Sequence, residues 1–154
     1  MARSVLGVIA GYLAMVLLVF LTFSGAYLLM GAEGAFRPAS YEVSGLWLAT
    51  SFVLSLLAAT AGGYVCAAVS RRDVAPVVMA GVVLVFGLMA AGQSMRAGGE
   101  SPARTGDVPN LAAAQQARTP PWVALLNPLV GAAGVLAGAR LRDDGHDPAA
   151  GAAA

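Results

Sequence analysis

Hydrophobic positions along this chain form four long uncharged runs, separated by shorter segments that hold the charged and turn-forming residues. The clearest run extends from Val43 to Ser70 and is closed by the adjacent arginines Arg71 and Arg72. A helix that spans a bilayer needs about 20 mostly apolar residues, and this run exceeds that length. The pattern therefore predicts a membrane-spanning helix over 43–70 rather than a core helix of a soluble domain.

Three further runs have the same character. They cover residues 5–30, 75–92 and 121–141. The first of them is much longer than the apolar core of a secretory signal, which is usually about 7–15 residues, so we expect an uncleaved span. The predicted fold class is all-α: a four-helix transmembrane bundle with antiparallel neighbours, formed by a single membrane domain over 1–142.

Polar residues gather in one long loop and at the C-terminus. Residues 93–119 contain glycines, prolines and scattered charges, which predicts an extramembrane loop with one short helix over 110–117 behind Pro109. Loops longer than about 12–15 residues are usually either functional or disordered, and the role of this one stays open. Residues 143–154 are predicted to form a disordered tail. In the first loop, Ser40 is predicted to cap the second span.

Composition supports lipid as the main solvent of this chain. Hydrophobic residues make up 58% of it and charged residues 11%, whereas an average soluble domain carries roughly 25% charged residues. A net charge of +1 gives no reason to expect a nucleic-acid partner, since that function usually shows a basic patch or stripe. All basic residues apart from one histidine are arginine, in a chain rich in alanine and glycine. The working hypothesis is a bacterial source and a multi-pass location in the inner (cytoplasmic) membrane.

The positions of the arginines predict an orientation. Arg71, Arg72, Arg140 and Arg142 lie directly at the ends of spans, whereas the arginines of the opposite side are spread over longer loops. Arginine and lysine near span ends concentrate on the cytoplasmic side. Both termini are therefore predicted to be cytoplasmic.

Small residues mark the faces on which the predicted helices are expected to pack, because they let helix backbones approach closely. The candidates are Gly7, Gly11, Ser51, Ser55, Gly62, Gly131, Gly134 and Gly138. The two serines are expected to bond back to carbonyls of their own helix. Asn127 is the candidate polar residue inside the membrane, where it can replace the backbone hydrogen bond that Pro128 removes or bond to a neighbouring helix. Structural support is the expected role of Asn127, ahead of a substrate contact.

Residues that carry chemistry are missing from the predicted spans. Apart from Arg140 at the end of the fourth span, no acidic or basic side chain falls inside a span, although proton-coupled transporters and ion pathways normally need such residues. The chain contains no Gly-rich phosphate loop, no Ser-His-Asp set and no HExxH motif. We therefore expect no enzyme activity, no catalytic, cofactor-binding or metal-binding residues, and no cofactor.

Several segments resemble a group of uncharacterised small bacterial inner-membrane proteins with four spans. They are Gly11-Tyr12-Leu13-Ala14-Met15, Thr22-Phe23-Ser24, Gly62-Gly63-Tyr64-Val65-Cys66, and the last span from Leu126-Asn127-Pro128 to Gly138-Ala139-Arg140-Leu141. The resemblance extends over all four spans and implies the same fold. No activity is established for that group, so it implies no functional residues.

Two functions fit these features. The first is a non-catalytic accessory or assembly subunit that packs against other membrane proteins, because small-residue faces coincide with an absence of buried charge. The alternative is a small transporter or channel formed by several copies of the chain, with a polar seam built from Ser51, Ser55, Thr60 and Asn127. The expected partners are the lipid bilayer and either another membrane protein or a second copy of this chain.

Overall fold

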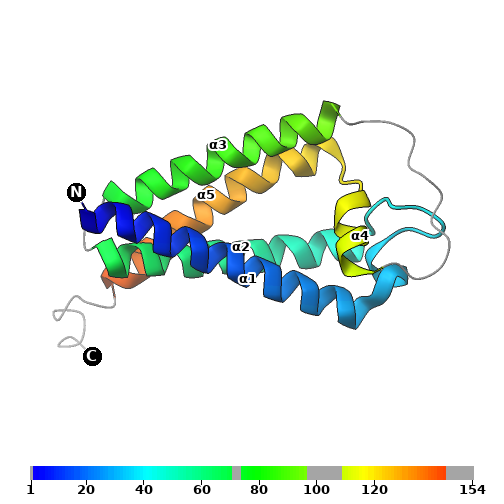
Figure 1. Cartoon of the computed structure of the whole chain (residues 1–154), viewed down its shortest axis with the longest axis horizontal. Coiled ribbons are helices and arrows are strands. Elements are labelled where there is room, and N and C mark those ends of the chain that lie inside the picture. The colour runs from blue at the N-terminus through cyan, green and yellow to red at the C-terminus, as the bar shows by residue number, and fades with distance from the viewer. Residues whose placement is uncertain (1, 71–73, 97–108, 145–154) are drawn as a thin grey trace.

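The computed structural model describes residues 2–70, 74–96 and 109–144, which form five helices and no extended strand (Figure 1). The helices are α1 (Ala2–Ala35), α2 (Gly45–Ser70), α3 (Val74–Arg96), α4 (Asn110–Gln116) and α5 (Pro121–Asp144). All except α4 are long and apolar enough to cross a membrane. The protein is an all-α four-helix bundle and a multi-pass membrane protein.

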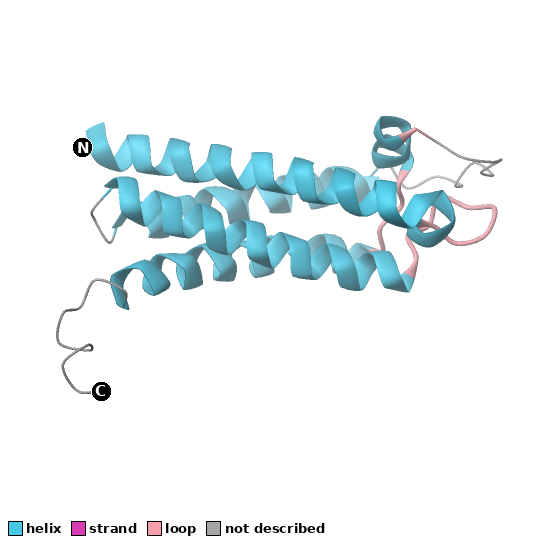
Figure 2. Cartoon of the chain, turned by 90° about the horizontal axis from the view of Figure 1, so that it is seen from below, coloured by secondary structure: helices cyan, strands magenta, loops and turns pink. Residues whose placement is uncertain are grey.

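The four long helices run alternately up and down, so the described ends of the chain lie at the same end of the bundle (Figures 1 and 2). The main packing is of α1 on α2, α2 on α5, and α5 on α3. Although α2 and α3 are antiparallel and follow each other in the chain, they share few contacts: α2 packs against α1 and α5, and α3 packs mainly against α5. Helices α1 and α3 share few contacts and diverge toward the end of the bundle that carries α4 (Figure 1).

Three helices continue beyond the predicted spans. Helix α5 reaches Asp144, within the predicted tail, of which residues 145–154 lie outside the described residues. Helix α3 reaches Arg96, because no helix-breaking residue follows Gly92 before the glycine pair at 98–99. Helix α1 continues to Ala35 through a break at Gly31, which has φ 65° and ψ 178°. Glycine reaches this backbone conformation without a Cβ clash. The 34 residues of α1 measure about 51 Å at 1.5 Å per residue, more than the hydrocarbon core of about 30 Å, so part of α1 lies outside the hydrocarbon.

The capping residue of α2 is Ser44, and the prediction of Ser40 is wrong. The Ser44 hydroxyl accepts a hydrogen bond from the Trp47 backbone N–H at 3.0 Å and donates one to the Gly34 carbonyl at 2.6 Å. The Ser40 hydroxyl instead accepts from the Glu42 N–H within the loop, at 3.0 Å. The loop stays extended as far as Val43 because that residue bridges Phe36, so α2 starts only after it.

A compact cap covers the end of the bundle opposite the termini. We define it as residues 32–44, helix α4 and residues 117–118. Its interior is aromatic: Tyr27 and Phe36 lie edge to face with ring centroids 6.4 Å apart, and Phe36 meets Tyr41 in the same way at 5.7 Å. Arg118 ties the segment after α4 to the first loop through backbone hydrogen bonds with Tyr41 and Val43, at 2.9 and 3.1 Å.

Helix α4 is docked on α1 within this cap. The Asn110 amide donates a hydrogen bond to the Ser24 hydroxyl at 2.9 Å, and Ala113 is buried in the aromatic cluster. The predicted short helix of the long loop is therefore a fixed part of the cap, and it lies beside the mouth of the bundle. The rest of that loop, residues 97–108, lies outside the described residues.

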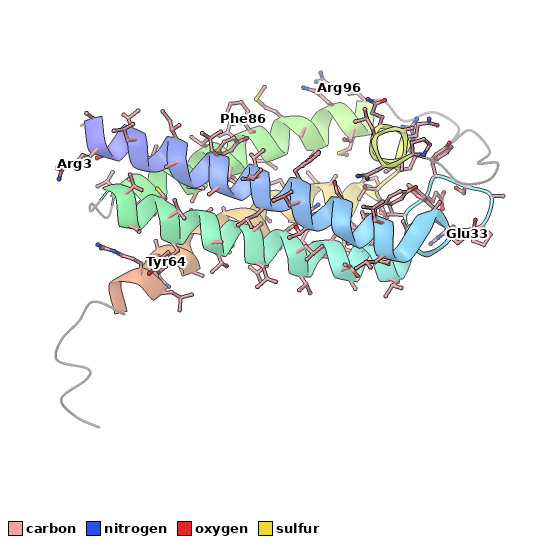
Figure 3. All side chains as sticks on the ribbon, turned by 60° about the horizontal axis from the view of Figure 1, so that its bottom comes forward. Arg3, Glu33, Tyr64, Phe86 and Arg96 are labelled. Carbon is pink, nitrogen blue, oxygen red and sulfur yellow. The ribbon has the colours of Figure 1, made fainter. Side chains whose placement is uncertain are left out.

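Charged side chains lie at the two ends of the bundle, while uncharged side chains cover its middle. Figure 3 shows Arg3 at one end and both Glu33 and Arg96 at the other. Large apolar side chains such as Leu13, Leu57 and Leu129 are more than half exposed between these ends. In a four-span protein these side chains contact lipid. Of the arginines used to predict orientation, Arg71 and Arg72 lie outside the described residues.

Candidate functional site

Glycines bring α1 and α2 into backbone contact. A Cβ added at Gly11 would lie 2.6 Å from the carbonyl oxygen of Gly62, and one added at Gly62 would lie 2.8 Å from the carbonyl oxygen of Gly11. One added at Gly7 would lie 2.7 Å from the Ser70 Cβ. The fully buried Met79 of α3 reaches this crossing, so the three helices meet near the end that carries the termini.

The contact between α2 and α5 is equally close. A Cβ at Gly138 would overlap the Thr60 carbonyl, and one at Gly134 would lie 2.8 Å from the Ala59 Cβ. Gly63 on α2 has the same role, since a Cβ there would overlap the Val135 carbonyl. Gly138 and Gly134 were singled out from the sequence, whereas Gly63 was not. Its position next to Gly62 in a Gly-Gly pair was the available signal.

Helices α3 and α5 meet at a proline. The Pro128 ring is packed against Gly87, where an added Cβ would lie 2.6 Å from the ring Cγ. One turn further along α5, a Cβ at Gly131 would lie 3.0 Å from a methyl group of Val83. These contacts join α3 to α5. Helix α1 does not follow α3 to this level, so an open space lies beside the joined pair.

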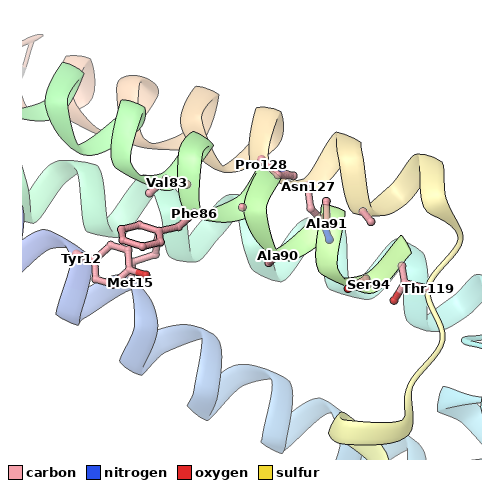
Figure 4. A pocket seen from close by; sticks show the side chains of 12 residues that line it. Tyr12, Met15, Val83, Phe86, Ala90, Ala91, Ser94, Thr119, Asn127 and Pro128 are labelled. Carbon is pink, nitrogen blue, oxygen red and sulfur yellow. The ribbon is translucent and has the colours of Figure 1, made fainter. Parts of the chain in front are cut away.

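The space between α1, α3 and α5 is a cavity of about 440 Å³. Figure 4 shows Tyr12 and Met15 of α1 at one end of it and Ser94 and Thr119 at the other. The remaining lining residues are Val83, Phe86, Gly87, Ala90, Ala91, Ala124, Asn127 and Pro128. The cavity is thus lined in mid-bundle by apolar side chains and the Tyr12 phenol, and at the cap end by the hydroxyls of Ser94 and Thr119; none of its lining residues carries a charge at neutral pH.

Asn127 is the amide side chain among the residues that line this cavity. Its side-chain oxygen Oδ1 is buried and accepts no hydrogen bond. Buried polar atoms in proteins are nearly always paired, so an unpaired amide oxygen needs an explanation. A second acceptor lies on the preceding turn of α5: Pro128 has no N–H, so the carbonyl of Ala124 lacks its usual helical donor. The sequence suggested that Asn127 would replace the bond that Pro128 removes or would bond to a neighbouring helix, and its Oδ1 accepts no hydrogen bond from any described residue.

The other polar residues proposed from the sequence do not join Asn127. The Ser51 hydroxyl donates to the Leu48 carbonyl at 2.8 Å, and the Thr60 hydroxyl donates to the Leu56 carbonyl at 2.8 Å. Ser55 is half-buried on the same helix, α2. None of the three lines the cavity, so the described residues do not form a single polar seam that includes Asn127.

Two arginines of the predicted cytoplasmic end fall in the described part of α5. Arg140 is exposed and Arg142 is half-buried. Both lie at the end of the bundle opposite the cap, together with Arg3. They are remote from the cavity and contribute no charge to its lining.

Comparisons with known proteins find no relative of this chain: no family model, no curated protein and no solved structure matches it. The function has to be argued from the residues themselves. Three features of the molecule bear on function: the glycine crossings, the cavity with its unpaired amide oxygen, and the outward faces of the helices.

Proposed function

We propose that this protein is a non-catalytic accessory or assembly subunit that packs against another membrane protein along the outer face of α3. We define this face by the residues that follow one another at helical spacing on the side of α3 away from α5. They are Val74, Val77, Gly81, Val85, Leu88 and Gly92. Lipid is the other partner of the bundle, through the apolar side chains that surround its middle.

The two glycines of this face carry the proposal. A Cβ at Gly81 or at Gly92 would meet no atom of this chain within 4 Å. A glycine inside a helix makes the helix less stable than an alanine would, by about 0.5–1 kcal/mol. At neither position does packing inside the bundle offset this loss of stability. Small residues on a membrane helix allow a second helix to approach closely. A partner helix lying on this face accounts for both glycines.

The packing glycines predicted from the sequence are occupied inside the bundle, which leaves the outer face of α3 as the candidate face for a partner. Gly7, Gly11, Gly62, Gly134 and Gly138 are all occupied by contacts inside the bundle. They are not available to a second protein without unfolding the first. Among the glycines of the membrane-spanning helices, an open environment remains at Gly25 and Gly31 on α1, at Gly45 on the first turn of α2, and at Gly81 and Gly92 on α3.

The test is site-specific crosslinking in native membranes. With Cys66 replaced by serine to leave a single thiol, Val77→Cys on the outer face of α3 is treated with a membrane-permeant crosslinker that has one thiol-reactive and one photoactivated end. We expect an adduct with a different, larger membrane protein. Gly81→Leu should reduce that adduct at least fivefold, whereas the matched variant Gly25→Leu should leave it unchanged.

The same experiment separates the alternative function. An adduct of twice the chain's own mass, lost on Gly81→Leu, would indicate a homo-oligomer and favour the small transporter or channel over the accessory subunit. The absence of any adduct from Val77→Cys, in membranes that contain folded protein, would contradict both functions at this face.

A further inference from the structure

We propose that the cavity between α1, α3 and α5 is a binding site for an uncharged lipid alcohol, with the hydroxyl group at Asn127 and the hydrocarbon chain against Phe86, Val83 and Met15. This inference is independent of the proposed contact on the outer face of α3, because that face lies on the other side of the helix from the cavity lining.

The dimensions fit a small ligand. A volume of about 440 Å³ lies within the range of roughly 300–1,000 Å³ that small-molecule pockets occupy. The position of the cavity also gives such a ligand a route from the bilayer, because it lies where α1 and α3 diverge and their mutual contacts are few. A molecule already dissolved in the membrane can enter sideways between these two helices.

The chemistry at Asn127 selects the hydroxyl group. A half-turn of the amide exchanges its oxygen and nitrogen, so the side chain offers either an acceptor or a donor, and a hydroxyl group complements both. The carbonyl that Pro128 leaves without a donor adds a second acceptor at Ala124. Ser94 and Thr119 add further hydroxyls toward the cap end (Figure 4).

Charge excludes the other common lipid head groups. The lining residues contain no acid to pair with an ammonium group and no arginine, lysine or histidine to pair with a phosphate or carboxylate. An unpaired charge at this depth is expensive. The opposite end of the cavity, at Met15, Val83 and Phe86, is apolar apart from the Tyr12 phenol and suits a hydrocarbon chain. An uncharged alcohol with a long chain matches this order of polar and apolar walls.

The test is photolabelling of the full chain, purified in mild detergent, with a long-chain fatty alcohol that carries a diazirine in its tail. We expect the label to map to the segments around Tyr12–Met15 and Val83–Ala90. Unlabelled hexadecanol should compete. Hexadecane, hexadecylammonium and palmitate should each compete at least tenfold less well, because they lack the hydroxyl group or carry a charge.

Two variants keep the test decisive. Asn127→Leu should reduce specific labelling about five- to tenfold, which corresponds to the loss of one hydrogen bond. Ala90→Phe should block the cavity from its exposed wall, and Leu88→Phe, on the outer face of α3, is its matched control. Thermal unfolding of each variant in the same detergent reports whether it is folded; if Asn127→Leu does not fold, Ala90→Phe decides.

Three results would overturn the proposal. Labelling that survives both Asn127→Leu and Ala90→Phe would place the alcohol elsewhere. Equal competition by hexadecane would mean that Asn127 selects no hydroxyl group. An absence of specific labelling would leave the amide hydrated by water only, without a lipid ligand.

Discussion

The glycines in the spans of this protein lie in two different environments, and each glycine can be assigned to one of them. Gly63 and Gly138 lie where a neighbouring backbone occupies the space of a Cβ atom, whereas Gly25 and Gly81 have no atom within 4 Å of that space. The first environment requires glycine for the bundle to close. The second has no such requirement within this chain, so substitution should have opposite consequences at the two kinds of position.

At the residue scale, we therefore expect Gly63→Val to destabilise the bundle. The added side chain would overlap the Val135 carbonyl, so α2 and α5 would have to move apart, and overpacking of this kind typically costs about 1–3 kcal/mol. The measurement is the free energy of unfolding in a mixed-micelle denaturant titration. The control is Gly25→Ala, which should be neutral or stabilising by up to about 1 kcal/mol. Equal destabilisation by both variants would contradict the distinction.

Sequence periodicity identified Gly7, Gly11 and Gly138 but not Gly63 or Gly81, and it could not assign the environment of any of these glycines. Gly7, Gly11 and Gly25 share a face of α1 in the sequence, yet only the first two touch another helix of the bundle. Periodicity fixes the direction in which a residue points from its own helix. It does not fix which part of that face a second helix covers: Phe23 and Tyr27 contact Trp47 of α2 on either side of Gly25, yet the Cβ position of Gly25 stays open. Toward the cap, α1 also diverges from α3. Asn127 was likewise recognised, while the cavity beside it depends on that divergence.

At the scale of elements, the start of α2 is determined by contacts with distant segments. Ser40 precedes an acidic residue and looks like a suitable cap in the sequence, but Val43 bridges Phe36 and bonds to Arg118, which holds the intervening loop extended. Ser44 is the first serine that the helix can use. No local pattern contains this information, because Arg118 lies far along the chain.

Ser44→Ala should accordingly weaken the start of α2. The substitution removes the bond to the Trp47 N–H and the bond to the Gly34 carbonyl, and loss of a serine cap costs about 0.5–2 kcal/mol. Faster hydrogen exchange at Gly45–Leu48, measured by mass spectrometry, should report it. Ser40→Ala is the matched control, and it should leave those amides unchanged. A larger increase in hydrogen exchange from Ser40→Ala than from Ser44→Ala would identify Ser40 as the capping residue.

At the scale of the whole molecule, hydropathy predicts the helices well because few backbone conformations other than the helix are stable in lipid. Backbone N–H and C=O groups in a bilayer must be paired within the protein, and a helix pairs them within one segment. Four apolar runs thus gave four helices. The ring of contacts from α1 through α2 and α5 to α3 was not predicted, since it depends on which small residues meet in space. The cap was not predicted either, because it joins two loops that are distant in the chain.

The even number of spans places both termini on one side, and the arginines near the span ends predict that this side is cytoplasmic. Single cysteines introduced into a Cys66→Ser background test this with a membrane-impermeant maleimide in intact cells. We expect labelling of Gln115→Cys, which is exposed on α4 in the cap, and protection of Ala2→Cys until the membrane is permeabilised. The reverse pattern would invert the orientation while keeping the fold. Labelling of both positions in intact cells would contradict the four-span topology itself, because helices that cross the bilayer four times cannot present the cap and the N-terminus to the same compartment.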